Sequence, residues 1–333
     1  MDHRLAGKVL DWIRPSLIIT IDTEIWPNVL HQANRRQIPV VMVNGRISAK
    51  SFRWYIKAQP ILAKVLENYA ALLMKAQEDA DRIQRLGASP SKITVIGNIK
   101  YDRSIAETAT MIEKTKSIDE AFGLSKYHDP LIIIGSTHED EEKTLLDVFR
   151  RIRSDARFSN TRLLIVPRHP ERFAAVGALA EREGYTVQRR SATTPDKAHA
   201  EVLLLDTLGE LGAAYQFATV AFVGGTLIPH GGQSIMEPAG WAKAVVIGPH
   251  MENFPGIIND FQERNAIVQI KADESDKERQ KDELTAEFLR LLADSSLREK
   301  IGTAAHSICV ESLGATGRAV DRIDEIYRKA QAT

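Results

Sequence analysis

Cysteine, net charge and long apolar runs are scarce in this 333-residue chain. The single Cys309 excludes a disulfide framework within the chain and a zinc site built on cysteines, as expected of a reducing compartment. Lysine plus arginine and aspartate plus glutamate both number 44, so no overall field attracts nucleic acid or an anionic membrane. No apolar run approaches the roughly 18 residues of a membrane-spanning helix, and the first residues lack the apolar core of a signal peptide. These absences favour a cytoplasmic protein that meets charged ligands locally and has no nucleic acid partner.

What is present is a regular alternation of short apolar runs with longer amphipathic stretches. This alternation is typical of parallel sheets that have helices on both faces. The strands we expect lie at 16–20, 39–44, 71–75 and 93–98 in the first part of the chain, and at 131–137, 161–168, 185–190, 201–206, 219–225, 244–249 and 266–270 in the second.

The pattern predicts an α/β fold with two Rossmann-like, doubly wound domains. We expect a partial first domain at 1–122, a second domain at 123–312 and a C-terminal helix at 313–333. The stretch 100–130 separates the two series, because it is polar and lacks a sustained apolar stripe. The first series has four strands against seven in the second, which predicts an incomplete first domain.

One glycine-rich segment, GGTLIPHGGQSIMEPAG at 224–240, directly follows an expected buried strand. Ligands of open α/β sheets bind beyond the carboxyl ends of such strands. Gly232 lets the backbone approach a ligand closely, and we expect the N–H groups of Gln233 and Ser234 at a helix N-terminus, where a phosphate is favoured. Glu237, one turn further, can accept hydrogen bonds from the vicinal hydroxyls of a ribose. The pattern indicates a nucleotide site; the alternative is an ordinary glycine-rich turn with a solvated glutamate.

Three further loops follow strands of the same series and are expected on the same edge of the sheet. In GSTHEDEE (135–142), Ser136 and Thr137 are ligand candidates, Thr137 is also a plausible N-cap, and the acids are expected to be helix-start charges. The arginines of VPRHPERF (166–173) indicate an anion or a base edge. DTLGEL (206–211) begins another helix and can offer backbone groups to a nucleotide.

In the first part of the chain, three expected strand ends carry charged side chains. IDTEIWPN contributes Glu24, NGRIS contributes Arg46 and GNIKYD contributes Lys100. Each is a weak signal alone, because exposed charges at strand ends are common. Together they indicate a site for an anionic, sugar-like group.

The sequence shows no motif for a metal site or a bound cofactor. The nine histidines are scattered, with no HExxH, and there is no P-loop, no GxSxG and no DxD pair placed to bridge a diphosphate and magnesium. A donor with a single phosphate, bound without a metal, therefore fits better than a nucleoside diphosphate that requires Mg²⁺.

Eight motifs, in the same order and over almost the whole chain, resemble those of the 3-deoxy-D-manno-octulosonic acid (Kdo) transferases. They are IDTEIWPN, NGRIS, GNIKYD, GSTHEDEE, VPRHPERF, DTLGEL, GGTLIPHGGQSIMEPA and GPHMENF. The resemblance implies a GT-B glycosyltransferase with two domains facing a cleft and a C-terminal helix that crosses back toward the first. It also implies the donor CMP-Kdo, a lipid A precursor as acceptor, and peripheral contact with the cytoplasmic face of the inner membrane.

The resemblance implies roles for individual residues. Glu24 and Lys100 match the charged pair credited with stabilising the transition state, and we expect Arg46 to bind the sugar carboxylate during an inverting, metal-independent displacement. The donor-binding residues expected, from the strand-end patterns and the resemblance together, are Pro167, Arg168, Leu208, Gly209, Glu210, Gly232, Gln233, Ser234, Ile235, Met236, Glu237, Ser136 and Thr137.

Two departures from the family pattern keep alternatives open. The family's general base is a glutamate of the N-terminal region that has no counterpart in this sequence, so inactivity of this chain is one expectation. Ser234 stands where the family usually has asparagine. The alternatives are a GT-B relative that uses a UDP-sugar and a non-catalytic protein that binds CMP.

Overall fold

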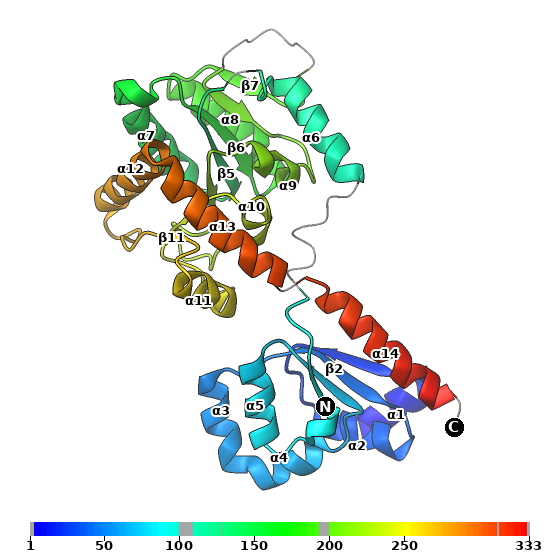
Figure 1. The fold of residues 1–333 in the computed structure, drawn as a ribbon. Helices are drawn as coiled ribbons and strands as arrows, with labels where there is room; N and C mark the ends of the chain where they lie inside the picture. The colour runs from blue at the N-terminus through cyan, green and yellow to red at the C-terminus, as the bar shows by residue number, and fades with distance from the viewer. Residues whose placement is uncertain (1–2, 100–108, 127, 193–199, 312, 332–333) are drawn as a thin grey trace. The chain divides into compact units, whose positions relative to one another are not determined.

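The contacts of the chain divide it into two compact units. The computed structural model describes residues 3–99, 109–126, 128–192, 200–311 and 313–331 (Figure 1). The N unit contains the described residues of Met1–Arg103 and Ser312–Thr333, and the C unit contains those of Ser104–Glu311. Both ends of the chain therefore contribute to the N unit.

The N unit is built on a four-stranded parallel sheet in the order β1-β2-β3-β4. Its strands are β1 (Ile18–Ile21), β2 (Val40–Gly45), β3 (Ala71–Met74) and β4 (Ile93–Val95). Its helices are α1 (His3–Ile13), α2 (Pro27–Arg35), α3 (Ala49–Tyr55), α4 (Gln59–Leu66), α5 (Gln77–Arg85) and α14 (Ala315–Gln331). All four expected strands are present, and β2 and β3 are wholly buried, as continuous apolar runs predict.

Each face of this sheet has its own core. Side chains alternate along β2, so Val40 and Met42 pack into one core while Val41 and Val43 pack into the other. The second core is closed by Ala319 of α14. Arg318 fastens the same helix, because its Nε and Nη2 donate to the Ile96 carbonyl at 2.9 and 2.7 Å. The C-terminal helix is thus a structural part of the N unit.

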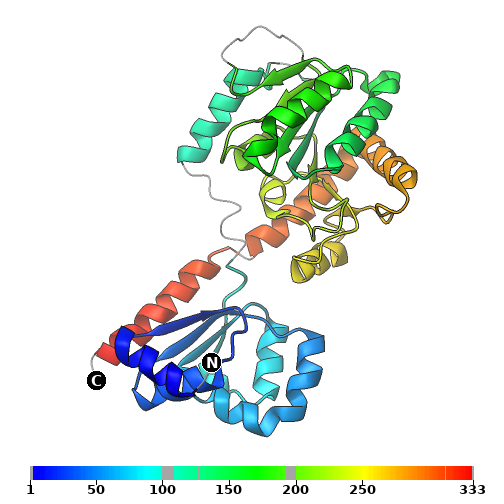
Figure 2. The same cartoon turned by 180° about the vertical axis from the view of Figure 1, so that it is seen from behind.

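The C unit is built on a seven-stranded parallel sheet in the order β11-β10-β9-β5-β6-β8-β7, with helices on both faces (Figure 2). Its strands are β5 (Leu131–Thr137), β6 (Arg162–Pro167), β7 (Val187–Arg189), β8 (Val202–Leu204), β9 (Val220–Val223), β10 (Val245–Ile247) and β11 (Val268–Gln269). Its helices are α6 (Ala109–Phe122), α7 (Glu141–Ser154), α8 (Phe173–Arg182), α9 (Leu211–Ala214), α10 (Met236–Gly240), α11 (Pro255–Glu263), α12 (Lys277–Ala293) and α13 (Ser295–Glu311). The expected doubly wound α/β arrangement is confirmed for this unit.

Helix α6 lies in the C unit, whereas we expected a domain boundary after residue 122. Two of its apolar side chains, Ile118 and Phe122, are buried. Polar contacts hold it as well, since the Gln188 side chain donates to the Ala121 carbonyl at 2.8 Å. Two buried positions in a charged helix are too few to produce an apolar stripe in the sequence, which explains why this helix was not expected.

The described part of the chain contains no candidate for a membrane-spanning helix. Among those residues, none of the helices combines the length and the apolar character needed to cross a bilayer.

Candidate functional site

The site in the C unit lies where the strand order of the sheet reverses. The chain enters the sheet at β5 and places β6, β7 and β8 on one side, then returns to place β9, β10 and β11 on the other. Open α/β sheets bind ligands at such a reversal, beyond the carboxyl ends of the flanking strands. Here those ends carry residues 135–137 and 224–225, which belong to two motifs identified in the sequence.

A β-bulge shapes the carboxyl end of β5. Between the residues that pair with Val166 and Pro167 of β6, this strand holds one extra residue, Ser136. Its φ of 57° is left-handed, a conformation that costs a non-glycine residue about 1–2 kcal/mol. Bulges and strained residues of this kind concentrate beside functional sites. Ser136 and Thr137, both expected to bind the donor, lie at the strand reversal.

The glycine-rich loop after β9 closes on itself. The Gly232 amide donates to the Gly225 carbonyl at 2.8 Å. Gly231 and Gly232 have φ values of 87° and 80°, which glycine adopts without steric cost. The two glycines therefore allow the chain to turn back over the end of the sheet.

The short helix α10 begins later than the sequence suggested. We expected Gln233 and Ser234 in its first turn, and this is wrong: the helix begins at Met236 and has five residues. Pro238 gives the reason, because a residue without an N–H is tolerated only in the first turn of a helix. Ile235 and Met236, both expected to bind the donor, are buried, so their side chains pack inside the protein. A phosphate bound here would meet the amides of an irregular loop.

Two acids of GSTHEDEE are buried, contrary to their expected role as solvated helix-start charges. Glu141 and Glu142 are 0% and 1% exposed, and burial raises the pKa of both carboxyls. Helix α7 begins at Glu141, so Thr137 is no N-cap; its hydroxyl donates to Glu142 Oε1 at 3.0 Å. The sequence could not distinguish the two roles, because acids are also favoured at exposed helix starts.

The loop after β6 brings two arginines beside the end of β5. Pro167 is buried and Arg168 is exposed, with its backbone amide donating to the Thr137 carbonyl at 2.9 Å. Arg172 pairs with the buried Glu142 at 3.1 Å. Of the two guanidinium groups, that of Arg168 is the one presented on the surface.

Three histidines that are distant in the sequence meet at this edge. The ring centroid of His138 lies 3.9 Å from that of His230 and 5.4 Å from that of His169. Burial and then the charges of these neighbours lower the pKa of His138 to about 4, so its ring is neutral at pH 7. Gln233 Nε2 lies 3.3 Å from His138 Nε2. Nothing in the sequence spacing predicted this cluster. Among the described residues, no group of three or more histidine, cysteine, aspartate or glutamate side chains is arranged so that it could hold a metal ion.

Some polar groups of the loop after β8 form hydrogen bonds with other residues of the protein. Glu210 is buried and accepts a hydrogen bond from Arg190 Nη2 at 3.1 Å. The Gly209 carbonyl accepts one from Lys114 Nζ of α6 at 2.7 Å. Leu208, in contrast, is 72% exposed. A ligand that binds the Gly209 carbonyl must therefore compete with Lys114.

Glu237 lies beside the helix that follows this loop. Its side chain is exposed, and a methyl group placed on Gly212 of α9 would lie 3.8 Å from its carboxylate carbon. Burial and then the charge of Glu237 raise the pKa of Tyr215 well above its ordinary value. The expected ribose-binding carboxylate is thus adjacent to α9, the helix that follows the loop of Leu208.

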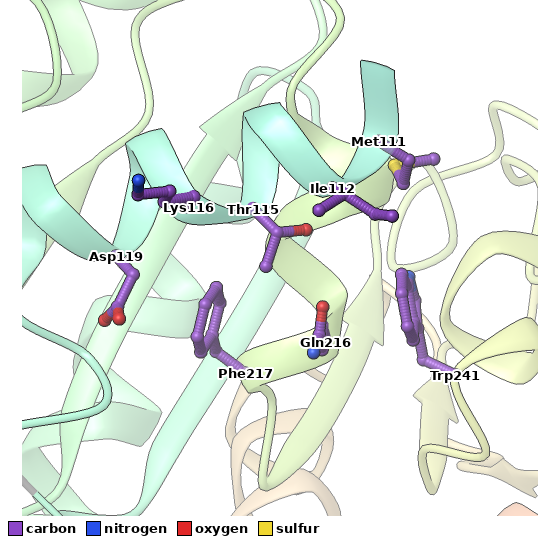
Figure 3. Close-up of a pocket in the computed structure, with 8 residues that line it drawn as sticks. All are labelled: Met111, Ile112, Thr115, Lys116, Asp119, Gln216, Phe217 and Trp241. Atoms are coloured by element: carbon purple, nitrogen blue, oxygen red, sulfur yellow. The ribbon is translucent and has the colours of Figure 1, made fainter. Parts of the chain in front are cut away.

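A hollow of about 420 Å³ opens near these residues (Figure 3). Helix α6 forms one side, and the turn at Tyr215–Phe217 together with Trp241 forms the other. Trp241 Nε1 donates to the Gly212 carbonyl at 2.7 Å, so Gly212 neighbours both the hollow and Glu237. The residues that line it are Met111, Ile112, Thr115, Lys116, Asp119, Gln216, Phe217 and Trp241. The sequence did not predict this hollow, because it did not predict α6.

In the N unit, Asn44 ties the strand ends together. Its side-chain amide donates to Asp22 Oδ1 at 2.8 Å, and its side-chain oxygen accepts from the Ile99 amide at 3.2 Å. Asn44 and Asp22 have left-handed φ values of 59° and 60°, which these residue types adopt more readily than most. One side chain thus joins the ends of β1 and β2 to the chain after β4.

Glu24 and Arg46, both expected to be catalytic, lie on adjacent strand-end loops of the N unit. The Arg46 amide donates to the Thr23 hydroxyl at 2.9 Å, which links the two loops. The Glu24 side chain is exposed and accepts a hydrogen bond from Trp26 Nε1 at 2.7 Å. Lys100, the third expected catalytic residue, lies outside the described residues.

The loop after β10 contacts the glycine-rich loop. Asn253 Nδ2 donates to the His230 carbonyl at 3.1 Å. In the same loop, the His250 ring lies 2.8 Å from Glu274 and 3.2 Å from Glu252. Burial alone would lower the pKa of His250, but hydrogen bonds with Glu274 and then Glu252 raise it above its ordinary value.

His250 is therefore expected to make the stability of the C unit depend on pH. Its contribution is complete below the ordinary histidine pKa of about 6.5 and is lost as the pH rises through the raised pKa of the folded state. Urea unfolding of the wild type and of His250→Gln at about pH 6 and pH 8 measures this contribution. The difference in the free energy of unfolding between the two proteins should be smaller at the higher pH. A difference that does not vary with pH would contradict the assignment. The lowered pKa of His138 changes the stability with pH in the opposite direction. Because His138 is present in both proteins, its effect cancels in the difference between them.

Two α/β units, each built on a parallel sheet with helices around it, have the architecture of the GT-B fold. A UDP-GlcNAc 2-epimerase from Neisseria meningitidis has this fold. It superposes with a TM-score of 0.55 over 97% of this chain and 80% of the epimerase, at 11% identity. A likeness at that identity shows the fold alone.

Within this class, the chain belongs to the 3-deoxy-D-manno-octulosonic acid transferase family of glycosyltransferases. A sequence model described as "3-Deoxy-D-manno-octulosonic-acid transferase (kdotransferase)" matches residues 2–103. The transferase of that name from Haemophilus influenzae is 33% identical over 314 residues, which cover 94% of this chain and 70% of the relative. The crystal structure of the C-terminal CMP-Kdo binding domain of WaaA from Acinetobacter baumannii is 28% identical, with a TM-score of 0.52, over 60% of this chain and 98% of that domain. The family resemblance expected from the motifs is confirmed.

Proposed function

We propose that this chain is a glycosyltransferase that moves Kdo from CMP-Kdo to a lipid A precursor in lipopolysaccharide biosynthesis. The observation that carries the proposal is the gathering of the loops after β5, β6, β8 and β9 at the carboxyl edge of the C unit, together with the likeness of this chain to a domain named for CMP-Kdo binding. A lipid acceptor implies peripheral contact with the cytoplasmic face of the inner membrane.

The C unit would bind the donor nucleotide. The amides of the glycine-rich loop and the exposed Arg168 suit the single phosphate of CMP-Kdo. The exposed carboxylate of Glu237 suits the ribose hydroxyls, and Leu208 at the adjacent loop suits contact with the base. Because the donor has one phosphate, this positive charge and these amides can neutralise it without a divalent ion.

The reaction would be an inverting displacement. The acceptor hydroxyl oxygen forms a bond to the anomeric carbon of Kdo while the bond from that carbon to the phosphate oxygen breaks, and CMP leaves with the electron pair. The hydroxyl proton goes to a general base; in the family this is a glutamate of the N-terminal region, which has no counterpart in this sequence, so the role is assigned to no residue of this chain. Glu24 would stabilise the positive charge that develops on the sugar, Arg46 would bind the sugar carboxylate, and Lys100 would stabilise the leaving phosphate.

Nucleotide binding tests the proposal. CMP is expected to raise the Tm of the chain and to bind in calorimetry, whereas UDP at the same concentration should do neither. Stabilisation by UDP alone would favour a UDP-sugar enzyme and overturn the proposal. If CMP binds, freshly made CMP-Kdo and a lipid A precursor then test transfer. Binding of CMP without any transfer would identify a non-catalytic CMP-binding protein.

Replacing Glu237 with alanine is expected to weaken CMP binding by about 1–3 kcal/mol, because a hydrogen-bonded charged group is lost from the ribose. Calorimetry at a fixed pH measures the effect. Glu299→Ala, which removes an exposed acid of α13, is the control and should bind CMP as the wild type does. Equal affinity of the Glu237 and Glu299 variants would refute the ribose assignment.

A further inference from the structure

The buried carboxylate of Glu141 joins two loops of the site. Its Oε2 accepts hydrogen bonds from the Gly225 amide at 2.7 Å and the His138 amide at 2.9 Å. Its Oε1 accepts from the amides of Thr226 and Leu227 at 3.0 and 2.9 Å. Three of these four donors are consecutive amides of the glycine-rich loop, those of 225–227. One side chain of α7 thus determines where that loop leaves the sheet.

Burial raises the pKa of Glu141, whereas these four contacts favour its ionised carboxylate. All four partners are N–H donors, and a carboxylate can accept from all of them, whereas an amide side chain would turn its own N–H groups toward two of them. Hydrogen bonds to a charged acceptor are about twice as strong as those between neutral groups. The first turn of α7 also favours a negative charge. The side chain is therefore suited to hold a backbone segment that belongs to no strand or helix.

Other groups fasten the same loop at its carbonyl oxygens. Gln280 of α12 donates to the Leu227 carbonyl at 3.1 Å, and the His250 amide donates to the Thr226 carbonyl at 3.1 Å. Asn253 donates to the His230 carbonyl. Glu141 complements them, because it orients the amides of 225–227 and so sets the direction in which the following residues return over the sheet.

The next residue on α7 serves the other loop of the site. Glu142 accepts from Arg172 of the loop after β6 and from the Thr137 hydroxyl. Two adjacent acids of one helical turn thus hold the glycine-rich loop and the arginine loop respectively. The turn sets the spacing between the two loops to which the proposed donor would bind.

We propose that Glu141 is a positioning residue for the donor site, holding the glycine-rich loop in its binding shape before the nucleotide arrives. This inference rests on the function proposed above, in which that loop receives the donor phosphate. A pre-ordered loop loses less conformational entropy on binding, so the affinity for the nucleotide depends on Glu141 although the side chain touches no ligand.

Hydrogen exchange and calorimetry on Glu141→Gln test the inference. Without ligand, the amides of 225–227 should exchange at least tenfold faster than in the wild type, while those of 132–134 in β5 and 163–165 in β6 stay unchanged. The Kd for CMP should rise at least tenfold at a temperature where both proteins are folded. Glu141→Asp, whose shorter side chain cannot reach all four amides, should give intermediate values.

Glu283→Gln is the matched control. Its carboxylate also accepts from two backbone amides, those of Lys271 and Ala272 at 2.8 and 3.0 Å, neither of which belongs to the glycine-rich loop. It should alter exchange only at 271–272 and leave the Kd for CMP unchanged. A Glu141 variant that behaves like this control would overturn the inference, as would failure of both Glu141 variants to fold.

The two proposals fail in different ways. If the wild type does not bind CMP, the proposed function is wrong, and the donor role of Glu141 falls with it. The exchange data then still decide whether Glu141 holds the loop. If the wild type binds CMP and Glu141→Gln binds equally well, only the positioning role is wrong.

Discussion

Alanine at position 224 is expected to abolish measurable CMP binding and to lower the free energy of unfolding by about 3 kcal/mol or more. A methyl group on Gly224 would lie 2.5 Å from the Ser136 carbonyl oxygen and 2.7 Å from Thr137 Cα. Both atoms are backbone, so no side-chain rotation relieves the clash. The ends of β5 and β9 must separate, and the site lies between them. Urea unfolding measures the first effect and calorimetry with CMP the second.

Gly317→Ala is the matched control for this substitution. Gly317 lies in α14, and nothing comes within 4 Å of an added methyl group. Alanine there should leave CMP binding unchanged and stabilise the protein by up to about 1 kcal/mol, because glycine is a poor helix former. Wild-type affinity in the Gly224 variant would contradict the location of the site between β5 and β9.

Removal of Arg172 is the second large effect we expect. Its side chain is 21% exposed and its partner Glu142 is 1% exposed, with 3.1 Å between Arg172 Nη2 and Glu142 Oε2. Arg172→Ala leaves that carboxylate buried without a counter-charge, which costs about 3 kcal/mol of unfolding free energy. Urea unfolding at pH 7 measures the loss. CMP affinity should fall as well, because the loop of Arg168 loses an anchor.

A second substitution separates charge from packing. Glu142→Gln combined with Arg172→Ala removes the buried charge, so the double variant should be more stable than Arg172→Ala alone. Arg264→Ala breaks an exposed pair, Arg264 with Glu311 at 2.7 Å, and should cost less than about 1 kcal/mol. If Arg172→Ala lowers the free energy of unfolding no more than Arg264→Ala does, the buried pair does not stabilise the fold.

The sequence alone predicts the two sheets and the family. Runs such as 131–137 and 219–225 are apolar without alternation because both faces of a parallel sheet are covered, and each contains a strand of the structure. The motifs at the strand ends could be recognised because each is local, and their order along the chain identifies the family without any knowledge of contacts.

Which of these residues form contacts inside the protein can be seen only in the folded chain. Glu141 binds amides 84 to 86 residues away, and His138 meets a ring from each of two other loops. Neither contact produces a periodicity or a regular spacing in the sequence. A buried acid that binds backbone amides therefore cannot be distinguished there from a solvated acid at the start of a helix. The same holds for α6, whose few buried side chains depend on a surface formed by distant segments. Burial and charge pairing depend on neighbours across the fold, and only the folded chain specifies those neighbours.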